Sequence, residues 1–267
     1  MNHERPGKLW IAALAASACL LAWPAQAGVA PRDYHEVGVS VPKGAGVPLD
    51  AVLTDETGRR RPLAELISGP AVLVFADYTC TTLCGPVVAF VASALEKSGL
   101  RPSRDFTLMV VGLDPKDSPV DAARMRRDHL GDGALNAAST FAAADQPTIE
   151  RLTAALGYRY TYDREHDQYV HPGAAFVLRG DGRVTRVLTG LGLSGTDMRL
   201  ALVEAGEGRI GTFADDVRLL CSGFDPEHGI YNLAILRVLA AASFATVLLL
   251  GGGIGLLILS GRRRRAA

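Results

Sequence analysis

The feature that most constrains this chain is a pair of cysteines placed between an apolar run and a helical pattern. Residues 71–75 are apolar throughout, which is typical of a strand buried on both faces of a sheet. Cys80 and Cys84 follow, and over residues 86–97 apolar side chains recur at helical spacing. A buried strand that leads through a short loop into a helix indicates an α/β fold.

Further strands and helices alternate along the chain. Apolar runs predict strands, and helical spacing between Ser or Pro starts and Gly stops predicts helices. The predicted elements are a hairpin within residues 49–66, strands over 106–113, 174–178 and 183–188, and helices over 118–130, 147–156 and 196–204. We therefore predict one α/β domain over residues 47–207, with a mixed sheet flanked by helices.

The beginning of the chain predicts export. Residues 1–27 combine basic residues, an apolar stretch and a small-residue site that ends at Ala27, which is the pattern of a cleaved signal peptide. Residues 28–46 are rich in Pro, Gly and charged residues and are predicted to be a linker.

The end of the chain predicts a membrane anchor. Residues 237–260 are long and apolar enough to cross a hydrocarbon core of about 30 Å as a helix. The tail, residues 261–267, carries a run of four arginines, which the positive-inside rule places in the cytoplasm. We therefore predict a single-pass membrane protein with its domain on the periplasmic side and a juxtamembrane segment over residues 208–236. A formal net charge of zero argues against nucleic-acid binding.

The cysteine content points to thiol chemistry rather than to a disulfide-stapled scaffold. Removal of the signal peptide, with Cys19, leaves Cys80, Cys84 and Cys221. A cysteine at a helix start has its thiolate favoured, and a thiolate is both the nucleophile of disulfide exchange and a soft ligand for Cu(I) or Zn(II). From spacing alone, Cys80 and Cys84 remain a redox pair, a metal site or a small structural disulfide.

One histidine stands where it can join the cysteines. His171 precedes Pro172, just before the predicted strand over 174–178, and strands that flank the first one end near the same edge of such a sheet. Asp77 and Asp114 follow two predicted strands, where each is a supporting group for the site or a solvated turn residue.

Four segments of the sequence resemble the Sco/SenC family, the thioredoxin-like copper proteins of cytochrome oxidase assembly. They occur in the family's order and spacing over residues 49–206, and read VLTDETGRRRPLAEL, AVLVFADYTCTTLCGPV, VVGLDPKDSP and YVHPGAAFVLRGDGRV. The resemblance implies a thioredoxin-like fold and a copper site formed by Cys80, Cys84 and His171. Where the family commonly has Pro after each cysteine, this chain has Thr81 and Gly85.

The resemblance also implies a function. A membrane-anchored metallochaperone, rather than an enzyme, would bind copper as Cu(I) or Cu(II) and deliver it to a cytochrome c oxidase subunit or another copper-acceptor protein. Two alternatives remain open: a thiol–disulfide reductase that needs only the two cysteines, and a redox or copper sensor whose membrane helix contacts a partner.

Other reactive residues fit simpler interpretations. Thr81 and Cys84 have the Thr-x-x-Cys spacing of peroxiredoxins, but those proteins carry Pro where this chain has Asp77, which argues against peroxidase activity. Cys221 and His228 share the juxtamembrane segment without a recognisable motif. The histidines predicted to lie on the surface are His35, His129 and His166.

Overall fold

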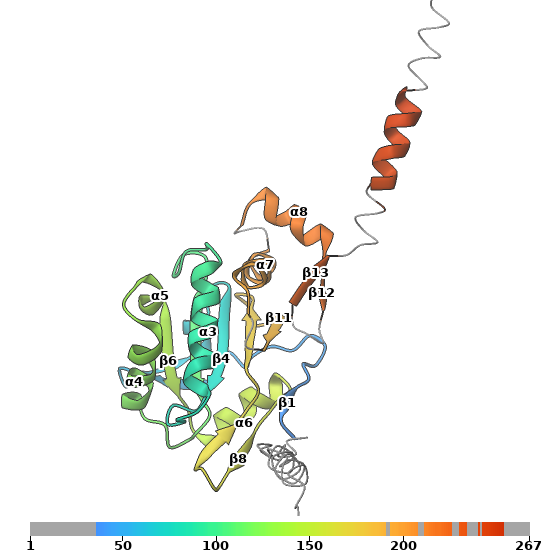
Figure 1. Ribbon diagram of the computed structural model, residues 1–267. Helices are drawn as coiled ribbons and strands as arrows, with labels where there is room; N and C mark the ends of the chain where they lie inside the picture. The colour runs from blue at the N-terminus through green and yellow to red at the C-terminus, as the bar shows by residue number, and fades with distance from the viewer. Residues whose placement is uncertain are drawn as a thin grey trace, which may run out of the picture. The chain divides into compact units, whose positions relative to one another are not determined.

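A seven-stranded mixed sheet forms the centre of the domain (Figure 1). The computed structural model describes residues 36–190, 193–207, 211–225, 230–233, 240 and 242–253. The strands of the sheet are β2 (Val52–Asp55), β3 (Arg60–Pro62), β4 (Ala71–Ala76), β5 (Thr107–Gly112), β6 (Ser139–Ala143), β10 (Ala174–Leu178) and β11 (Val184–Thr189). Their order is β11-β10-β4-β5-β6-β2-β3, in which β4, β5 and β6 are parallel and the outer strands pair antiparallel.

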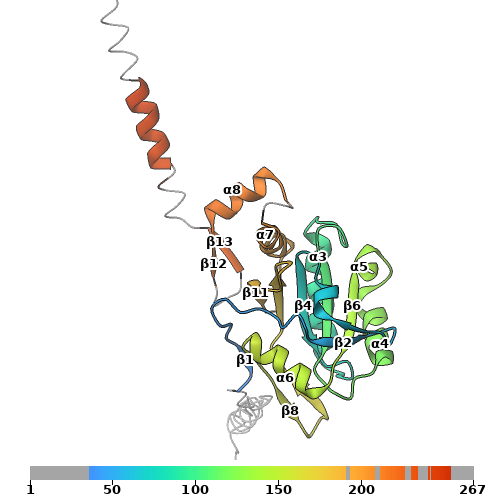
Figure 2. The ribbon, with the colours of Figure 1, turned by 180° about the vertical axis from the view of Figure 1, so that it is seen from behind.

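Helices cover both faces of this sheet (Figures 1 and 2). The helices of the domain are α2 (Leu63–Leu66), α3 (Cys84–Lys97), α4 (Pro119–Leu130), α5 (Ala134–Ala137), α6 (Gln146–Ala155) and α7 (Gly195–Ala205). Val72 and Val74 of β4 face a core shared with α3, α4 and α7, whereas Leu73 and Phe75 face a core shared with α2 and α6. Because both faces of β4 are buried, its sequence is apolar at every position rather than at every second one.

The pairing of two central strands determines where the functional residues meet. β10 runs antiparallel to β4, with Ala175 opposite Val74 and Leu178 opposite Ala71. The beginning of β10 therefore lies beside the end of β4. The chain just before β10, which includes His171, is brought to the loop that connects β4 with α3.

Smaller elements surround the sheet. They are β1 (Gly38–Val39) paired with β7 (Tyr158–Arg159), the hairpin β8 (Thr161–Asp163) and β9 (Gln168–Val170), α8 (Phe213–Cys221), and β12 (Ser222–Asp225) paired with β13 (Ile230–Leu233). β1 lies within the predicted linker over residues 28–46, and the backbone of Ser40 also donates a hydrogen bond of 2.8 Å to the carbonyl of Gly157. Part of that segment is therefore hydrogen-bonded to the domain.

The structure confirms the predicted α/β fold with a mixed sheet, and each strand and helix predicted between residues 47 and 207 is present within a few residues of its expected bounds. The sequence did not reveal β6, the third parallel strand, or the β8–β9 hairpin. The predicted signal peptide (1–27), His35, His228 and the basic tail (261–267) lie outside the described residues.

The predicted membrane span over residues 237–260 is described only in part. Residues 242–253 are helical with exposed side chains. Across the described residues, no helix combines the length and the apolar character needed to cross a membrane.

Candidate metal and thiol site

Cys80 and Cys84 follow the central strand β4: Cys80 lies in the loop between β4 and α3, and Cys84 begins α3. Cys80 is in the connecting loop and is partly exposed, whereas Cys84 is the first residue of the helix and is buried. Both are free thiols. The two sulfurs therefore differ in access: one is open to solvent and the other belongs to the core.

His171 points one ring nitrogen at the buried cysteine. Its Nε2 lies 3.2 Å from Sγ of Cys84, while its Nδ1 lies 2.9 Å from the hydroxyl of Tyr158 and 3.2 Å from the carbonyl of Pro172. The Tyr158 hydroxyl donates to that carbonyl at 2.8 Å, so its oxygen is free to accept from Nδ1–H. This arrangement favours the tautomer in which Nε2 carries the lone pair, and burial lowers the pKa of His171. The imidazole is therefore neutral at pH 7 and presents a ligand nitrogen to the cysteine.

The two thiols have opposite electrostatic environments. The side chain of Cys84 hydrogen-bonds to Cys80 and, aided by Thr82, lowers the pKa of Cys80 to about 4, although burial acts in the other direction. The Thr82 hydroxyl lies 3.3 Å from Sγ of Cys80. The same hydrogen bond, together with burial, raises the pKa of Cys84 far above its usual value. At neutral pH the pair is therefore a thiolate at Cys80 and a thiol at Cys84.

Asp77 connects the cysteine loop to the strand that precedes His171. Its carboxylate is fully buried, and Oδ1 accepts hydrogen bonds from the backbone of Thr79 (3.0 Å), the hydroxyl of Thr79 (2.9 Å) and the backbone of Cys80 (3.1 Å). Oδ2 accepts from the backbone of Tyr169 at 2.8 Å, across 92 positions of sequence. The sequence left the role of Asp77 open, and the structure makes it the group that holds both halves of the site together.

The β8–β9 hairpin is attached to the rest of the site by polar contacts at its turn. Nζ of Lys116 lies 2.9 Å from the carboxylate of Asp167 in the hairpin and 3.5 Å from that of Asp114 at the end of β5. Asp114 is buried and also accepts a hydrogen bond of 2.8 Å from the backbone of Lys116, so it shapes this turn. These contacts fix the strand that leads to His171.

A third buried carboxyl group, that of Asp117, lies next to the loop between β4 and α3. One oxygen of Asp117 lies 3.4 Å from the backbone nitrogen of Tyr78, and the other has no hydrogen-bond partner among the residues the structure describes. Burial, with Asp77 and Asp114 nearby, raises the pKa of Asp117 to about 8. This carboxyl group is therefore largely protonated at neutral pH.

The predicted ligand atoms are the sulfurs of Cys80 and Cys84 and Nε2 of His171, and the three are not all close enough to one another to bind a single metal ion. Metal–ligand bonds of about 2.0–2.3 Å require ligand atoms within about 4.5 Å of one another. In the described part of the chain, the only three His, Cys, Asp or Glu side chains with ligand atoms all within 4.8 Å are Asp163, Glu165 and His166, at the exposed turn of the hairpin. Cys84 and His171 are already in contact at 3.2 Å, so closure requires the partly exposed side chain of Cys80 to move toward them.

Sequence reasoning missed two members of this site. The hydroxyl of Tyr158 orients His171, and His129 packs against the first turn of α3, where it is partly buried rather than on the open surface as predicted. No motif marks either residue. His166 is exposed, as predicted, and the side chain of Cys221 is outside the described part of the structure.

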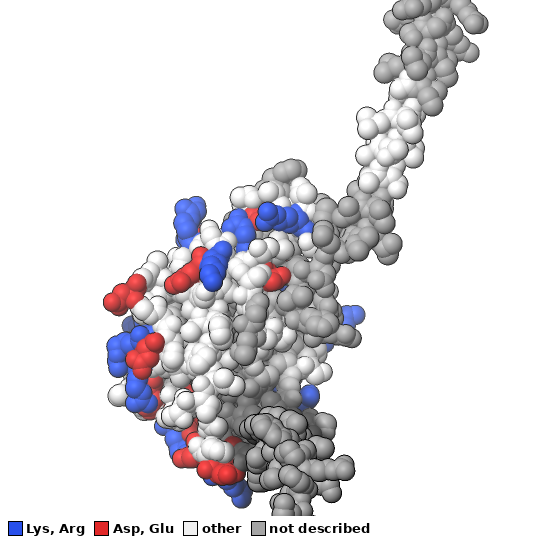
Figure 3. All heavy atoms as spheres, in the orientation of Figure 1, with Lys and Arg blue, Asp and Glu red and all other residues white. Residues whose placement is uncertain are grey.

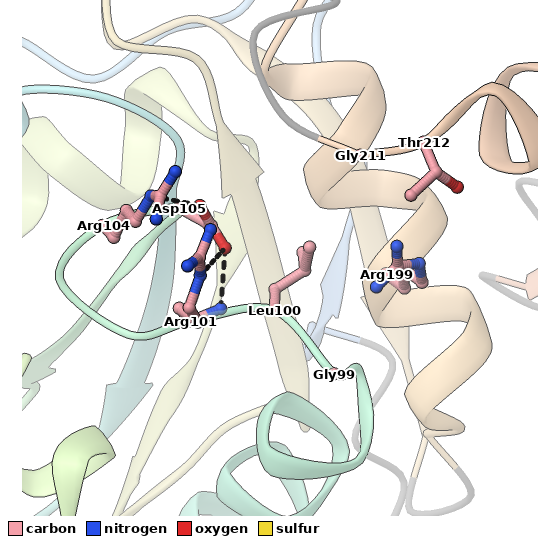
Figure 4. A pocket seen from close by; sticks show the side chains of 8 residues that line it. All are labelled: Gly99, Leu100, Arg101, Arg104, Asp105, Arg199, Gly211 and Thr212. Atoms are coloured by element: carbon pink, nitrogen blue, oxygen red, sulfur yellow. Dashed lines mark hydrogen bonds and ion pairs between the residues drawn. The ribbon is translucent and has the colours of Figure 1, made fainter.

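The surface around the site is not uniformly charged. Figure 3 shows acidic and basic side chains together along the edge that carries α4 and α5, whereas the surface over α3 is largely uncharged. Leu83 and Phe90 belong to this region and are 62% and 45% exposed. A separate cavity, of about 380 Å³, lies between the loop that connects α3 to β5 and the helix α7. Figure 4 shows Arg101 and Arg104 of this loop paired with Asp105.

The asymmetry of the two thiols predicts a pH profile for alkylation. In the reduced, metal-free protein, iodoacetamide should react with Cys80 at a nearly constant rate between pH 6 and 8. This follows because a thiol with a pKa of about 4 is already ionised in that range, whereas an ordinary thiol loses about tenfold in rate per pH unit below its pKa. Mass spectrometry of the modified chain would measure the rate at each cysteine.

The Cys84→Ala variant is the matched control for this prediction. It removes the main hydrogen bond to Cys80 and should shift the rise in reactivity to higher pH. A wild-type rate that rises tenfold from pH 6 to 7 would show that Cys80 is an ordinary thiol.

Comparison with known proteins supports the fold. No family model and no curated protein sequence matches the chain. Among solved structures, a protein of Aquifex aeolicus described as a candidate electron transfer protein matches with a TM-score of 0.55 at 23% identity, over 61% of this chain and 93% of its own. Arabidopsis thaliana ScoI, solved with copper bound, matches with a TM-score of 0.50 at 12% identity, over 61% and 96%.

A third similar structure is that of a protein with a disulfide switch. BsSco, a Sco protein of cytochrome c oxidase assembly in which a disulfide switch was identified, matches with a TM-score of 0.52 at 18% identity, over 63% of this chain and 98% of its own. At these identities the likeness concerns the fold, and it confirms that the domain has the thioredoxin-like fold of the Sco/SenC structures.

Proposed function

We propose that this chain is a copper carrier that binds one copper ion through Cys80, Cys84 and His171 and passes it to an acceptor protein, either a cytochrome c oxidase subunit or another copper acceptor. The observation that carries the proposal is the contact of 3.2 Å between Nε2 of His171 and Sγ of Cys84, with the other ring nitrogen fixed by Tyr158. A reductase can form its mixed disulfide without such a nitrogen, whereas this copper site needs the nitrogen as a ligand.

The chemistry of the three side chains suits copper. Soft thiolates favour Cu(I), and imidazole binds copper in both oxidation states. Cys80 is already ionised and Nε2 of His171 already carries a lone pair, so binding must displace only the proton of Cys84. Because Cys80 is partly exposed, an acceptor can replace the ligands of copper one at a time.

We also propose that the domain is exported and anchored by a C-terminal helix, with the domain on the periplasmic side and the arginine-rich tail in the cytoplasm. The apolar stretch and the arginine run support this orientation. A reporter enzyme that is active only in the cytoplasm should be active when fused after Arg265, and an inactive fusion that is stably expressed would contradict the orientation.

The copper proposal is tested by titration of the full-length, reduced protein in detergent. The wild type should bind about one Cu(I) per chain, and His171→Ala should weaken binding by about 100-fold or more, because a ligand is lost. Arg164→Ala, which removes an exposed side chain from the hairpin turn, is the control and should leave the affinity unchanged. If His171→Ala binds copper as tightly as the wild type, His171 is not a ligand.

A second function is favoured by the asymmetry of the thiols. In disulfide exchange, the exposed thiolate of Cys80 would attack a disulfide of the acceptor and release one acceptor thiolate. The thiol of Cys84 would pass its proton to Nε2 of His171 and attack the sulfur of Cys80. The acceptor would leave as a dithiol, with one proton from Cys84 by way of His171 and one from solvent. Its two electrons would come from Cys80 and Cys84, which are oxidised to a disulfide with each other.

Copper binding and disulfide reduction can be distinguished experimentally, because they begin with different steps. Formation of the mixed disulfide depends on Cys80 alone, so His171→Ala should leave its rate within about twofold while copper affinity falls. The Cys84→Ala variant should accumulate the mixed disulfide with a test disulfide. If no mixed disulfide forms, the reductase function is excluded.

A further inference from the structure

A cleft opens directly onto the exposed cysteine. It has a volume of about 270 Å³ and lies between the cysteine loop and α4. Its lining residues are Tyr78, Thr79, Cys80, Thr81, Arg124, Met125, Asp128 and His129. Cys80 is therefore reached from the side of α4, and His171 does not line this cleft.

His129 occupies an unusual position in the wall of the cleft. A Cβ atom placed on Gly85 would lie 2.3 Å from Nε2 and 2.4 Å from Cε1 of the His129 ring, so the ring fits only because residue 85 has no side chain. Gly85 directly follows Cys84 in the first turn of α3. The nitrogen edge of the imidazole therefore faces the backbone next to the cysteine pair.

This imidazole is not engaged elsewhere. Within the described ranges, His129 makes no hydrogen bond or ion pair. Of the other charged groups of the cleft, Arg124 pairs with Asp121 at 2.7 Å, and Asp128 is exposed. A nitrogen ligand without a partner among the described residues thus lines the same cleft as the partly exposed sulfur of Cys80.

We propose that His129 is a second imidazole ligand, which together with Cys80 holds copper on the cleft side while the ion is loaded or handed over. This inference rests on the proposed copper-carrier function. Thiolate and imidazole form a suitable pair for copper, and Cys80 is exposed enough for its side chain to turn toward the cleft. Movement of the ion to the cleft side breaks its bonds to Nε2 of His171 and Sγ of Cys84 and forms one to His129, and Cys84 takes up a proton from solvent. The oxidation state of copper does not change, and Cys80 stays bound throughout.

The positions of His171 and His129 suggest different roles in copper binding. His171 is oriented by Tyr158 and lies against the buried cysteine, which suits stable binding. His129 lies at the solvent side of Cys80, where a donor or an acceptor of copper must arrive. Loss of His129 should therefore change the rate of copper exchange more than the affinity.

The first test measures exchange with the full-length protein in detergent, loaded with Cu(I) and mixed with a colorimetric Cu(I) chelator. His129→Ala should slow removal of copper by about tenfold or more and change the equilibrium affinity by less than about threefold. Gly85→Ala should have the same effect, because its methyl group displaces the ring without removing the histidine. Arg127→Ala, which removes an exposed side chain from α4, is the matched control and should exchange like the wild type.

The second test uses the His171→Ala background and Cu(II) EPR. His171→Ala should retain one nitrogen coupling from His129, and the double variant His129→Ala/His171→Ala should lose it together with at least about tenfold in affinity. Circular dichroism before loading confirms that each variant is folded. If His129→Ala and Gly85→Ala exchange copper at the wild-type rate, and the nitrogen coupling of His171→Ala survives removal of His129, the inference is wrong.

These outcomes separate the inference from the function on which it rests. A wild-type protein that binds no copper overturns both. If the wild type binds copper, loses affinity on removal of His171 and shows no change in affinity or exchange rate on removal of His129, only the proposal of His129 as a second ligand is overturned.

Discussion

Replacing Cys80 and Cys84 together by alanine is expected to reduce copper binding from about one ion per chain to none that survives gel filtration. The two sulfurs supply the soft ligands, and the remaining imidazole of His171 binds Cu(I) too weakly to retain it alone. Copper analysis of the purified protein after gel filtration measures the loss. The variant should also lack the thiolate-to-copper absorption of the Cu(II) form.

Cys221 provides the control. Cys221→Ala removes one thiol from the chain but leaves the pair at the end of β4 intact, so it should bind copper like the wild type. Equal copper content in the double variant and the wild type would place the copper at another site and remove the carrier function.

Replacing Asp77 by alanine is expected to lower the free energy of unfolding by about 3 kcal/mol, because it removes a fully buried carboxylate and leaves the partly buried hydrogen bonds from the backbone of Thr79, Cys80 and Tyr169 without their acceptor. It should also weaken copper binding, since the same carboxylate joins the cysteine loop to the strand before His171. Urea denaturation of the metal-free protein measures the stability, and Cu(I) titration measures the affinity.

Two variants make this prediction specific. Asp50→Ala removes an aspartate that is 77% exposed and paired with Arg151, so it should change stability by less than about 0.5 kcal/mol. Asp77→Asn keeps an oxygen for the loop donors but replaces the acceptor of Tyr169 by a donor, so it should retain more stability than alanine. A stable Asp77→Ala variant with unchanged copper affinity would show that Asp77 does not hold the site together.

The sequence reveals those parts of the fold that have a local signal, either a continuous apolar run or a helical spacing of apolar residues. β4 and β10 are continuous apolar runs, and α3, α4 and α6 carry clear start and stop residues, so their positions follow from local rules. β6 does not stand out, because its sequence STFAA is short and contains only one β-branched residue, and its place in the sheet depends on pairing with β5 and β2. The β8–β9 hairpin is likewise held by contacts that only the folded chain makes.

The same distinction applies to the site. Cys80, Cys84 and His171 flank predicted strands, so their meeting at one edge of the sheet can be inferred from strand order. The contacts of Tyr158 and His129 cannot be inferred in this way. They depend on the direction of side chains from distant elements, and for His129 on the absence of a side chain at Gly85.

The antiparallel pairing of β4 with β10 has a consequence for how the site behaves without metal. These strands lie near the middle of the sheet and are buried along their length, and such segments exchange their amide hydrogens only when the whole domain opens. The two chain segments that carry the sulfurs and the imidazole therefore keep their relative position before any ion arrives. Copper uptake then requires little ordering of the backbone, and amide protection of β4 and β10 in the metal-free protein should already match that of the loaded form.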